Sequence, residues 1–336
     1  MQFPLFFLIS FAFSFTNSFA QDIETQEEIV SLKYYGVRLT KEKQNPKPRK
    51  SQINNSNFDG ANWMKSVSDD RKIFSISIPG THESCTRLGG PSMQAQDWSI
   101  EEQLLNGVRY FDIRCRHLNN IFMIHQAEVY QELTYYTGVQ KIIINFLKAH
   151  PSEFVFLQIK EEYTPSGNTR TFEETMKSYI FSFEKYFYLN EDSPTLSQVR
   201  GKIVLLRRFE STITPLGNYL EWKDNTIWTS NTTIVAQIED CYVVQTLFVR
   251  WAKWNHFLSN IEEALNNTDP DKMFLSFSSG YSSGCYPWSV VDYMNPRIGN
   301  YLENDEPERF VGIIAFDYIN SGYDNMIEFL VKRNYQ

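Results

Sequence analysis

The sequence predicts a single α/β barrel, and three features of its 336 residues lead to this fold class. Near-continuous apolar runs recur along the chain, as expected for strands that are buried on both faces of a parallel sheet. Segments with helical periodicity lie between several of these runs, which gives a β-α alternation. The stretch from Trp63 to Gln336 also has the length, ~250 residues, at which such barrels commonly remain one domain.

The first strand candidate is the run Ile73–Ile78, which alternates with a period of two. Pro79 and Gly80 follow it, and we expect them to end the strand, because proline offers no backbone donor and glycine permits a sharp turn. His82 then lies on a tight turn at the carboxyl end of this strand. A histidine there can transfer protons, or it can simply pack and form hydrogen bonds.

Five later apolar runs also lead into ionisable residues, and this repetition favours a functional role. Reactive side chains at strand carboxyl ends gather on one face of a parallel barrel, where such folds hold their active sites. The runs and their residues are Val108–Phe111 with Asp112 and Arg114, Ile121–Ile124 with His125, Phe154–Ile159 with Lys160, Ile203–Leu206 with Arg207 and Arg208, and Val311–Phe316 with Asp317. Helices are predicted over Ile100–Leu105, Val139–Ala149 and Thr171–Tyr186.

Residues 1–20 are predicted to be a secretory signal peptide, with an apolar block and a small-x-small sequence before cleavage after Ala20. Because this segment starts without lysine or arginine, an uncleaved anchor is the alternative. Residues 21–57 are polar and mixed in charge, and we expect them to form an extended, poorly packed arm. The barrel then occupies residues 58–336, and the protein is predicted to be secreted or to enter the endomembrane lumen.

The formal net charge of −8 argues against nucleic acid as a partner, because nucleic-acid binding requires a basic face. It also argues against strong long-range attraction to anionic membranes. A site that handles phosphate would therefore be a local basic pocket, for which Arg114, Lys160 and Arg208 are the candidates. We expect the protein to be a monomer.

Four cysteines are present, and an even number in an oxidising compartment suggests disulfides. We predict that Cys85 and Cys115 are bonded, since they follow neighbouring strand candidates, with Cys241 and Cys285 as a weaker second pair. Buried free thiols are the alternative. No CxxC pair occurs, which argues against a zinc site. Predicted N-glycosylation sequons begin at Asn54, Asn231 and Asn266.

The residue types at the strand ends suit cleavage of a phosphodiester without a metal. One neutral imidazole can take a proton from an attacking hydroxyl, while a second, protonated imidazole gives one to the leaving oxygen. An arginine binds two phosphate oxygens in a fixed fork, and a carboxylate can hold the basic imidazole in its working tautomer. Asp112 and Arg114 are two apart and share a strand face, where a purely structural ion pair is the alternative.

Six motifs resemble the X-domain of phosphatidylinositol-specific phospholipases C, in the bacterial, metal-independent branch. They are IPGTHES, FDIRCR, IFMIHQ, HPSEFVFLQIKEEY, GKIVLLRR and FDYIN, in the expected order within residues 60–336. The resemblance implies a distorted TIM barrel that needs no cofactor. It also implies an enzyme that meets a membrane and cleaves phosphatidylinositol, or glycosylphosphatidylinositol, to diacylglycerol and inositol cyclic phosphate.

The resemblance further implies roles for single residues. Glu83 and Asp112 are added as candidate catalytic carboxylates, although Glu83 stands where the bacterial motif has aspartate. Gln126 follows the matched histidine where glycine is usual. The matches are His82 for the general base, Asp317 for its orienting carboxylate, His125 for the general acid, Arg114 for the phosphate-binding arginine that replaces calcium, and Lys160, Arg208, Asp240 and Tyr242 for the inositol pocket.

Membrane contact is predicted for Tyr286 and Trp288, because the loop 278–288 is aromatic and such side chains favour the lipid interface. A core position for Trp288 is the alternative. Two other function classes stay open. One is a metal-dependent phosphodiesterase resembling glycerophosphodiesterases, with Glu83, Asp112 and Glu161 as oxygen ligands. The other is a secreted protein that binds inositides with weak catalysis or none.

Overall fold

The computed structural model describes residues 5–39, 58–305 and 309–335. Its centre is a twelve-stranded sheet in which eight neighbouring strands run parallel. In spatial order these are β6 (Phe187–Tyr188), β7 (Ile203–Arg207), β5 (Val155–Glu161), β2 (Tyr110–Leu118), β1 (Ile78–Thr81), β12 (Ile313–Phe316), β11 (Met273–Phe277) and β10 (Val235–Glu239).

The two edges of this sheet meet without a continuous backbone ladder. The short strand β8 (Asn218–Tyr219) pairs with β7, and β9 (Ile227–Asn231) runs antiparallel to β10. Side chains bridge the seam: the backbone N–H of Tyr219 donates to Thr233 Oγ1 at 2.8 Å, and that of Glu221 donates to Ser230 Oγ at 3.1 Å. The predicted distorted barrel is therefore confirmed.

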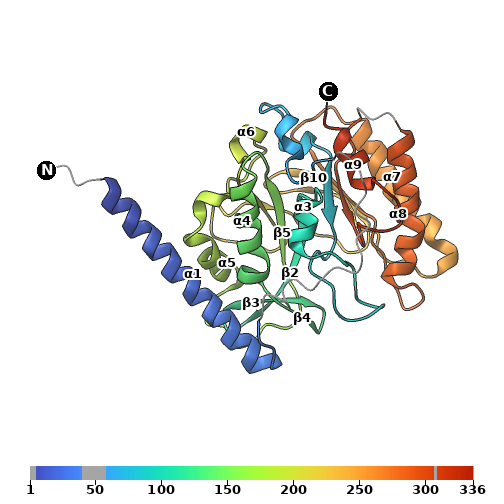
Figure 1. Ribbon diagram of the computed structural model, residues 1–336. Helices are drawn as coiled ribbons and strands as arrows, with labels where there is room; N and C mark the ends of the chain where they lie inside the picture. The colour runs from blue at the N-terminus through green and yellow to red at the C-terminus, as the bar shows by residue number, and fades with distance from the viewer. Residues whose placement is uncertain (1–4, 40–57, 306–308, 336) are drawn as a thin grey trace.

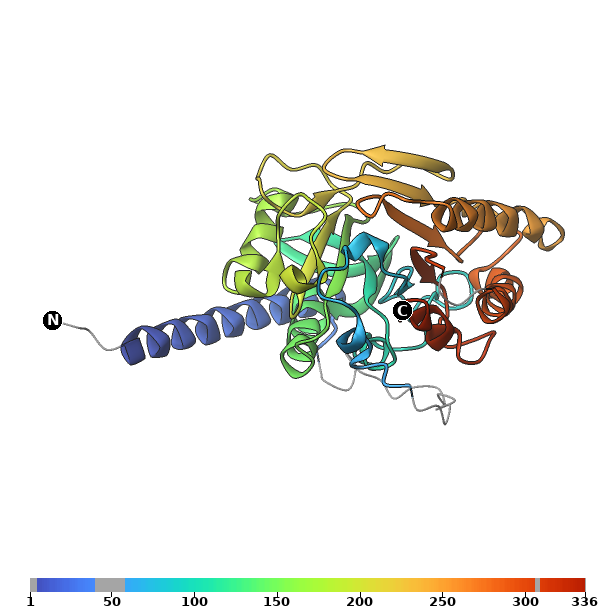
Figure 2. The same ribbon diagram turned by 90° about the horizontal axis from the view of Figure 1, so that it is seen from above.

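Helices surround the strands (Figures 1 and 2). The three predicted helical segments are confirmed, and two of them begin directly after a capping residue. Ser99 and Thr171 form capping boxes at the first and third of them, which satisfies backbone N–H groups there. The helices of the barrel are α3 (Ile100–Leu105), α4 (Lys141–Ala149, preceded by a π-helix Tyr136–Gln140), α5 (Phe172–Phe181), α6 (Leu196–Val199), α7 (Arg250–Leu265), α8 (Pro287–Asn304) and α9 (Met326–Lys332).

The first strand lies later in the chain than the alternation indicated. Residues Ile73–Ser75 form a 3-10 helix, whereas Pro79 and Gly80 lie inside β1. Proline fits this central strand because pairing with β2 begins only at Gly80, so no N–H is needed at Pro79. Gly80 leaves room for the neighbouring strand, since a Cβ there would lie 2.7 Å from Tyr110 Cδ1. The expectation that Pro79-Gly80 ends the strand was wrong, but His82 still follows its carboxyl end.

The strand β2 continues beyond the barrel and forms an antiparallel extension with β3 (Ile121–Gln126) and β4 (Val129–Thr134). Asp112 and Arg114 consequently lie within β2 rather than beyond its end. This extension lies at the end of the barrel where the parallel strands finish, beside the N-terminal helix (Figure 1).

The N-terminal helix α1 (Leu5–Tyr35) replaces the extended arm that the polar sequence suggested. Glu27 is fully buried and accepts hydrogen bonds from Thr134 Oγ1 at 2.6 Å, from the backbone N–H of Tyr136 at 2.8 Å and from both donors of Thr137. The prediction of a poorly packed segment was thus wrong for residues 21–35, because this one buried carboxylate fixes the helix to the start of the π-helix.

The signal-peptide interpretation of residues 1–20 stays a prediction. Within the described ranges, no helix combines the length and the apolar character needed to cross a bilayer. Of the predicted glycosylation sites, Asn231 at the end of β9 and Asn266 after α7 are exposed. Asn54 lies outside the described residues.

All four cysteines are free thiols in the structure, so the predicted disulfides are not formed. Cys85 and Cys115 are buried in the same hydrophobic cluster, between the strands and the helices outside them. They pack there as small apolar side chains, and burial raises the pKa of Cys85 to about 12. Cys241 is half-buried after β10, and the Sγ atom of buried Cys285 lies 3.3 Å from Ser289 Oγ.

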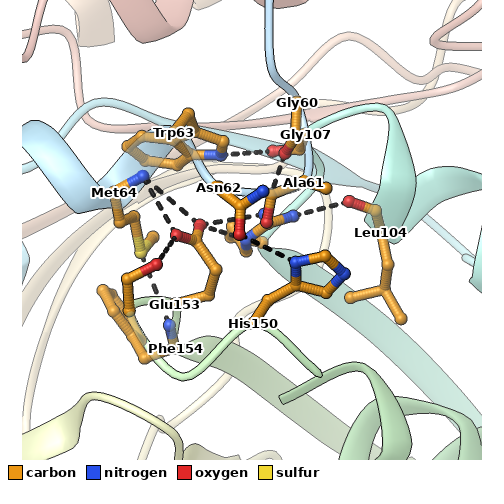
Figure 3. A network of polar contacts seen from close by, with 12 residues as sticks. Gly60, Ala61, Asn62, Trp63, Met64, Leu104, Gly107, His150, Glu153 and Phe154 are labelled. Carbon is orange, nitrogen blue, oxygen red and sulfur yellow. Dashed lines mark hydrogen bonds and ion pairs between the residues drawn. The ribbon is translucent and has the colours of Figure 1, made fainter. Parts of the chain in front are cut away.

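A buried ion pair holds the barrel end opposite the β3–β4 extension. Arg109 and Glu153 are both fully buried, just before β2 and β5, and the guanidinium lies 2.9 Å from Glu153 Oε2. Its other donors reach the carbonyl groups of Gly60, Ala61, Leu104 and Val108. Figure 3 shows how Glu153 also accepts the backbone N–H of Met64, so one network fixes the segment before β1 to the barrel.

We expect Arg109→Met to lower the free energy of unfolding by about 3–5 kcal/mol, because the Glu153 carboxylate would remain buried without its partner. Urea unfolding followed by circular dichroism measures this loss. The matched control is Asp69→Asn, which removes the ion pair between Asp69 and Arg200. The Asp69 side chain is 64% exposed, so this pair lies near solvent. Its cost should be about 0–1 kcal/mol. Equal losses in the two variants would contradict the assignment.

Candidate active site

A pocket of about 330 Å³ opens at the carboxyl ends of the parallel strands. It lies where a parallel barrel brings the residues after its strands together. Most residues predicted from the sequence meet here, although they come from six different strands or the turns after them. Those that line the pocket are His82, Glu83, Arg114, Lys160, Arg208, Asp240, Tyr242 and Asp317.

His82 is held in one defined tautomer. Its Nδ1 lies 2.8 Å from Asp317 Oδ1, and its Nε2 lies 3.0 Å from Arg114 Nη2. Because arginine can only donate, Nε2 must be the acceptor of that contact. The proton of the neutral ring is therefore on Nδ1, where it is donated to Asp317. The lone pair on Nε2 faces Arg114 and the pocket, as a general base requires.

The charges around His82 favour its protonated form. Burial alone would lower the pKa of this imidazole, but the carboxylates of Asp317 and Glu83 outweigh burial and raise the pKa above its ordinary value. The Glu83 Oε1 atom lies 3.6 Å from His82 Nε2. A base with a raised pKa binds its proton more firmly, so it is well suited to remove one from an alcohol near neutral pH.

Arg114 contacts two acidic side chains, of which Glu83 lines the pocket and Asp112 does not. Its Nη1 lies 2.6 Å from Glu83 Oε1, and its Nη2 lies 3.3 Å from Asp112 Oδ2. Asp112 is fully buried and also accepts a hydrogen bond from Gln158 Nε2 at 3.0 Å. Burial opposes the charge on Asp112, yet Arg114 and Arg208 hold the pKa of this carboxyl well below its usual range. The predicted shared face of Asp112 and Arg114 is confirmed.

The opposite wall of the pocket combines cations with aromatic rings. The Arg208 guanidinium lies 3.4 Å from the centre of the Trp222 ring, and Trp222 Nε1 donates to Asp240 Oδ2 at 3.1 Å. Tyr242 donates its hydroxyl to Asp224 at 3.0 Å. Within the described chain, Arg208 Nε and Nη1 are buried without a hydrogen-bond partner. They are free to bind a ligand oxygen, a feature that suits an anionic or hydroxyl-rich ligand.

The sequence analysis missed Trp222 and Asp224. Neither belongs to an apolar run that ends in a charge, and both lie in the irregular segment between β8 and β9. Lys160, which was predicted, forms an ion pair with Glu162 at 2.8 Å. Burial, followed by repulsion from Arg114, lowers the pKa of this lysine.

The structure does not bring His125 together with the other predicted residues. Successive side chains of a strand point to opposite faces, and on β3 it is Gln126, not His125, that lines the pocket. The His125 ring stacks on Tyr163, and its Nε2 lies 2.8 Å from the Tyr35 hydroxyl of α1. Since Nδ1 faces the Ala127 carbonyl at 3.2 Å, Nδ1 donates there and Nε2 accepts from Tyr35.

The surroundings of His125 keep its ring neutral. Burial lowers its pKa to about 4, so at neutral pH this imidazole has no acidic proton to give. Its contacts instead connect helix α1 to the wall of the pocket, because Ala127 also lines it. The pairing register of β3 decides whether residue 125 or residue 126 faces the pocket. Only a correct prediction of that register could have shown that His125 points away from the pocket.

The oxygen ligands of the metal-dependent alternative are not gathered in one place. Glu161 lies next to Lys160 on β5 and does not line the pocket, whereas Glu83 and Asp112 both contact Arg114. Across the described ranges, no group of three or more histidine, cysteine or acidic residues could hold a metal ion. The guanidinium supplies the positive charge between these carboxylates.

Exposed aromatic side chains lie around the start of α8 and α7. Tyr286 and Trp288 are both about half exposed, although the Trp288 ring also packs edge-on against Tyr318. The sequence analysis missed Phe248, which is 90% exposed in the short 3-10 helix Leu247–Val249 before α7. The two segments are adjacent, because Arg250 Nη1 donates to the Ser289 carbonyl at 2.7 Å.

We expect the His82 imidazole to titrate above 6.5, its ordinary value, because Asp317 and Glu83 stabilise the charged ring. Asp317→Asn should lower the midpoint, since it removes the nearer negative charge. Nuclear magnetic resonance of the histidine side chains measures both midpoints, and Glu161→Gln serves as a control outside the pocket. A wild-type midpoint at or below 6.5 would contradict this account of the site.

Comparison with known proteins agrees with this geometry. Residues 81–209 match the family model described as phosphatidylinositol-specific phospholipase C, X domain. The protein described as 1-phosphatidylinositol phosphodiesterase from Staphylococcus aureus (strain Newman) is 28% identical over 301 residues, which cover 81% of this chain and 94% of that protein. A protein of the same description from Listeria monocytogenes is 31% identical over 157 residues, 43% of this chain and 47% of that protein.

Solved structures that are similar to this chain are also phosphatidylinositol-specific phospholipases C. A phosphatidylinositol-specific phospholipase C from Staphylococcus aureus, studied for the modulation of its membrane binding, aligns with a TM-score of 0.76 and 25% identity over 83% of this chain and 98% of that chain. The Listeria monocytogenes enzyme shares the fold, with a TM-score of 0.68 and 24% identity over 82% of this chain and 99% of its own. The resemblance seen in the sequence is thereby confirmed, and this chain is a relative of the bacterial phosphatidylinositol-specific phospholipases C.

Proposed function

We propose that this protein is a phosphodiesterase that cleaves phosphatidylinositol into diacylglycerol and inositol cyclic phosphate. The observation that carries the proposal is the arrangement of His82, which Asp317 orients and whose Nε2 lone pair faces Arg114 in the pocket. The relatives described as 1-phosphatidylinositol phosphodiesterases support the same substrate.

In this proposal the inositol hydroxyl next to the phosphate is the nucleophile. His82 Nε2 takes its proton as the oxygen attacks phosphorus, and Asp317 stabilises the imidazolium that forms. Arg114 contacts the phosphate oxygens and stabilises the charge that develops on them. Asp112, with its strongly lowered pKa, remains ionised and keeps the guanidinium in place.

The inositol ring would occupy the wall formed by Lys160, Arg208, Asp240 and Tyr242. Charged groups there can bind ring hydroxyls, while the Tyr242 ring offers an apolar face for the sugar. Glycosylphosphatidylinositol has the same inositol phosphate, so we include it among the proposed substrates. With residues 1–20 as a signal peptide, the enzyme would meet such lipids outside the cytosol or in the endomembrane lumen.

We expect cleavage to proceed without a metal ion, since the Arg114 guanidinium already lies between the carboxyl groups of Glu83 and Asp112. Phosphorus nuclear magnetic resonance of the products formed from phosphatidylinositol, with and without excess chelator, is the test. Inositol cyclic phosphate should appear at the same rate in both samples. Activity that disappears with chelator and returns with calcium would favour the metal-dependent alternative.

We propose that Phe248, Tyr286 and Trp288 contact the membrane, because exposed aromatic rings favour the lipid interface. Phe248→Ser should lower the rate on phosphatidylinositol vesicles by about tenfold or more and leave the rate on a soluble inositol phosphate ester unchanged, since each buried aromatic contributes about 1.5–3 kcal/mol. Phe181→Ser is the matched control, because Phe181 is a phenylalanine 68% exposed at the end of α5. Equal losses on both substrates would refute the membrane role.

A second function is supported by one observation. Because Gln126 rather than a histidine lines the pocket beside Ala127, a protein that binds phosphatidylinositol and cleaves it weakly also fits the site. Vesicle binding without inositol cyclic phosphate in the resonance experiment would identify it.

A further inference from the structure

We propose that helix α1 is part of the active site, because Tyr35 and His125 act as positioning residues for a turn that forms one wall of the pocket. The inference rests on the proposed function and concerns how its site is held in shape. The turn of residues 126–128 joins β3 to β4, and Gln126 and Ala127 line the pocket. Among the described residues, Tyr35 and His125 do not line the pocket, so their effect on it passes through this turn.

The turn has a backbone conformation that needs support from its surroundings. The φ angle of Ala127 is +46°, in the left-handed region that residues with a side chain rarely adopt. His125 Nδ1 donates to the Ala127 carbonyl at 3.2 Å. The His125 ring also stacks on Tyr163, whose φ angle is +61°. This imidazole thus contacts two strained segments, and strain that surrounding contacts maintain is typical of functional sites.

Helix α1 fixes this imidazole through the other ring nitrogen. The Tyr35 hydroxyl lies 2.8 Å from His125 Nε2, and Arg116 Nη1 donates to the same hydroxyl at 2.9 Å. Because arginine can only donate, the hydroxyl proton is free to be donated to His125 Nε2. The Tyr35 ring also stacks on Tyr130 of β4, with ring centres 4.2 Å apart. The end of α1 therefore contacts both strands of the hairpin that carries the turn.

The helix is also anchored by contacts that do not involve Tyr35. The buried Glu27 carboxylate accepts hydrogen bonds from residues 134–137. Ser31 Oγ lies 3.0 Å from the Tyr130 hydroxyl, in a buried position. Loss of the Tyr35 hydroxyl alone should therefore leave the helix in place and change only its hold on the imidazole.

The opposite side of the turn reaches a cation of the pocket. The Ala127 N–H donates to the Glu162 carboxylate. That carboxylate pairs with Lys160 Nζ at 2.8 Å and lies 4.0 Å from Arg114 Nη1. Burial would raise the pKa of Glu162, but Arg114, Lys160 and this N–H outweigh burial and lower it. Since Arg114 has closer partners of its own, the turn mainly positions Lys160, a residue of the proposed inositol wall.

The test uses a soluble inositol phosphate ester of a simple alcohol, whose leaving group needs a proton. We expect His125→Ala and Tyr35→Phe to raise its KM by about two- to tenfold, the effect of one lost hydrogen bond, and to leave kcat nearly unchanged. His125→Asn should restore the wild-type KM, because the amide keeps a donor near the place of Nδ1 although it cannot titrate. Tyr34→Phe is the matched control at a neighbouring α1 tyrosine that is 41% exposed, and it should change neither constant.

Other results would overturn the inference. If His125→Asn loses as much kcat as His125→Ala and the basic limb of the pH profile disappears, His125 is a proton donor. An unchanged KM in Tyr35→Phe would remove α1 from the site. Nitrogen nuclear magnetic resonance of the wild type needs no variant to fold: at neutral pH the His125 ring should carry its proton on Nδ1, and a proton on Nε2 would contradict the proposed contacts.

Failure of the proposed function would look different. In that case the wild-type protein would cleave neither this ester nor phosphatidylinositol, whatever the state of His125. The same variants would then be compared by their Kd for the ester, which should rise in His125→Ala and Tyr35→Phe and return to the wild-type value in His125→Asn. An equal Kd in all of them would overturn the positioning role.

Discussion

The position of the Arg114 guanidinium determines how the charged side chains in and beside the pocket are arranged. Arg114 lies between Glu83 and Asp112 and also donates to His82 Nε2, so three residues from two strands depend on it for their arrangement. A buried cation with such partners is far more stable than an isolated one, because each carboxylate offsets the loss of hydration. Without this charge, two carboxylates would repel each other in the interior of the barrel.

The two acidic side chains that contact this guanidinium lie in different surroundings. Asp112 is fully enclosed, receives several hydrogen bonds and carries a lowered pKa, so it remains charged. Glu83 contacts the same guanidinium but carries a raised pKa, because burial dominates there. The pKa values of two acidic side chains beside one arginine thus shift in opposite directions because their surroundings differ.

Much of the barrel and most of the pocket could be predicted from local patterns. The residues after the apolar runs converge because parallel strands end on one face, and this rule placed His82, Arg208 and Asp317 correctly. Pro79 inside β1 could not be predicted, since it is tolerated only because pairing with β2 starts one residue later. Likewise, the face on which His125 lies depends on the register in which β3 pairs with β2 and β4. The apolar run Ile121–Ile124 alone does not determine this register.

Helix α1 shows the limit of such reasoning most clearly. Its polar composition resembles that of an unfolded arm, yet Glu27 is bound by groups more than one hundred residues later in the chain. Tyr35 likewise reaches His125 and accepts from Arg116 at 2.9 Å. No pattern within α1 reveals these distant partners, because a buried carboxylate and an exposed one look alike in sequence.

The path of α1 also has a consequence for the order of events during biosynthesis. The peptide bond between Ala20 and Gln21 lies inside this helix, and Ala20 packs partly against the hydrophobic core. Peptidases act on extended, accessible backbone rather than on a docked helix. If residues 1–20 are a signal peptide as predicted, their removal would therefore have to take place while the nascent chain is still unfolded, and Gln21 would then be the first residue of a shortened helix.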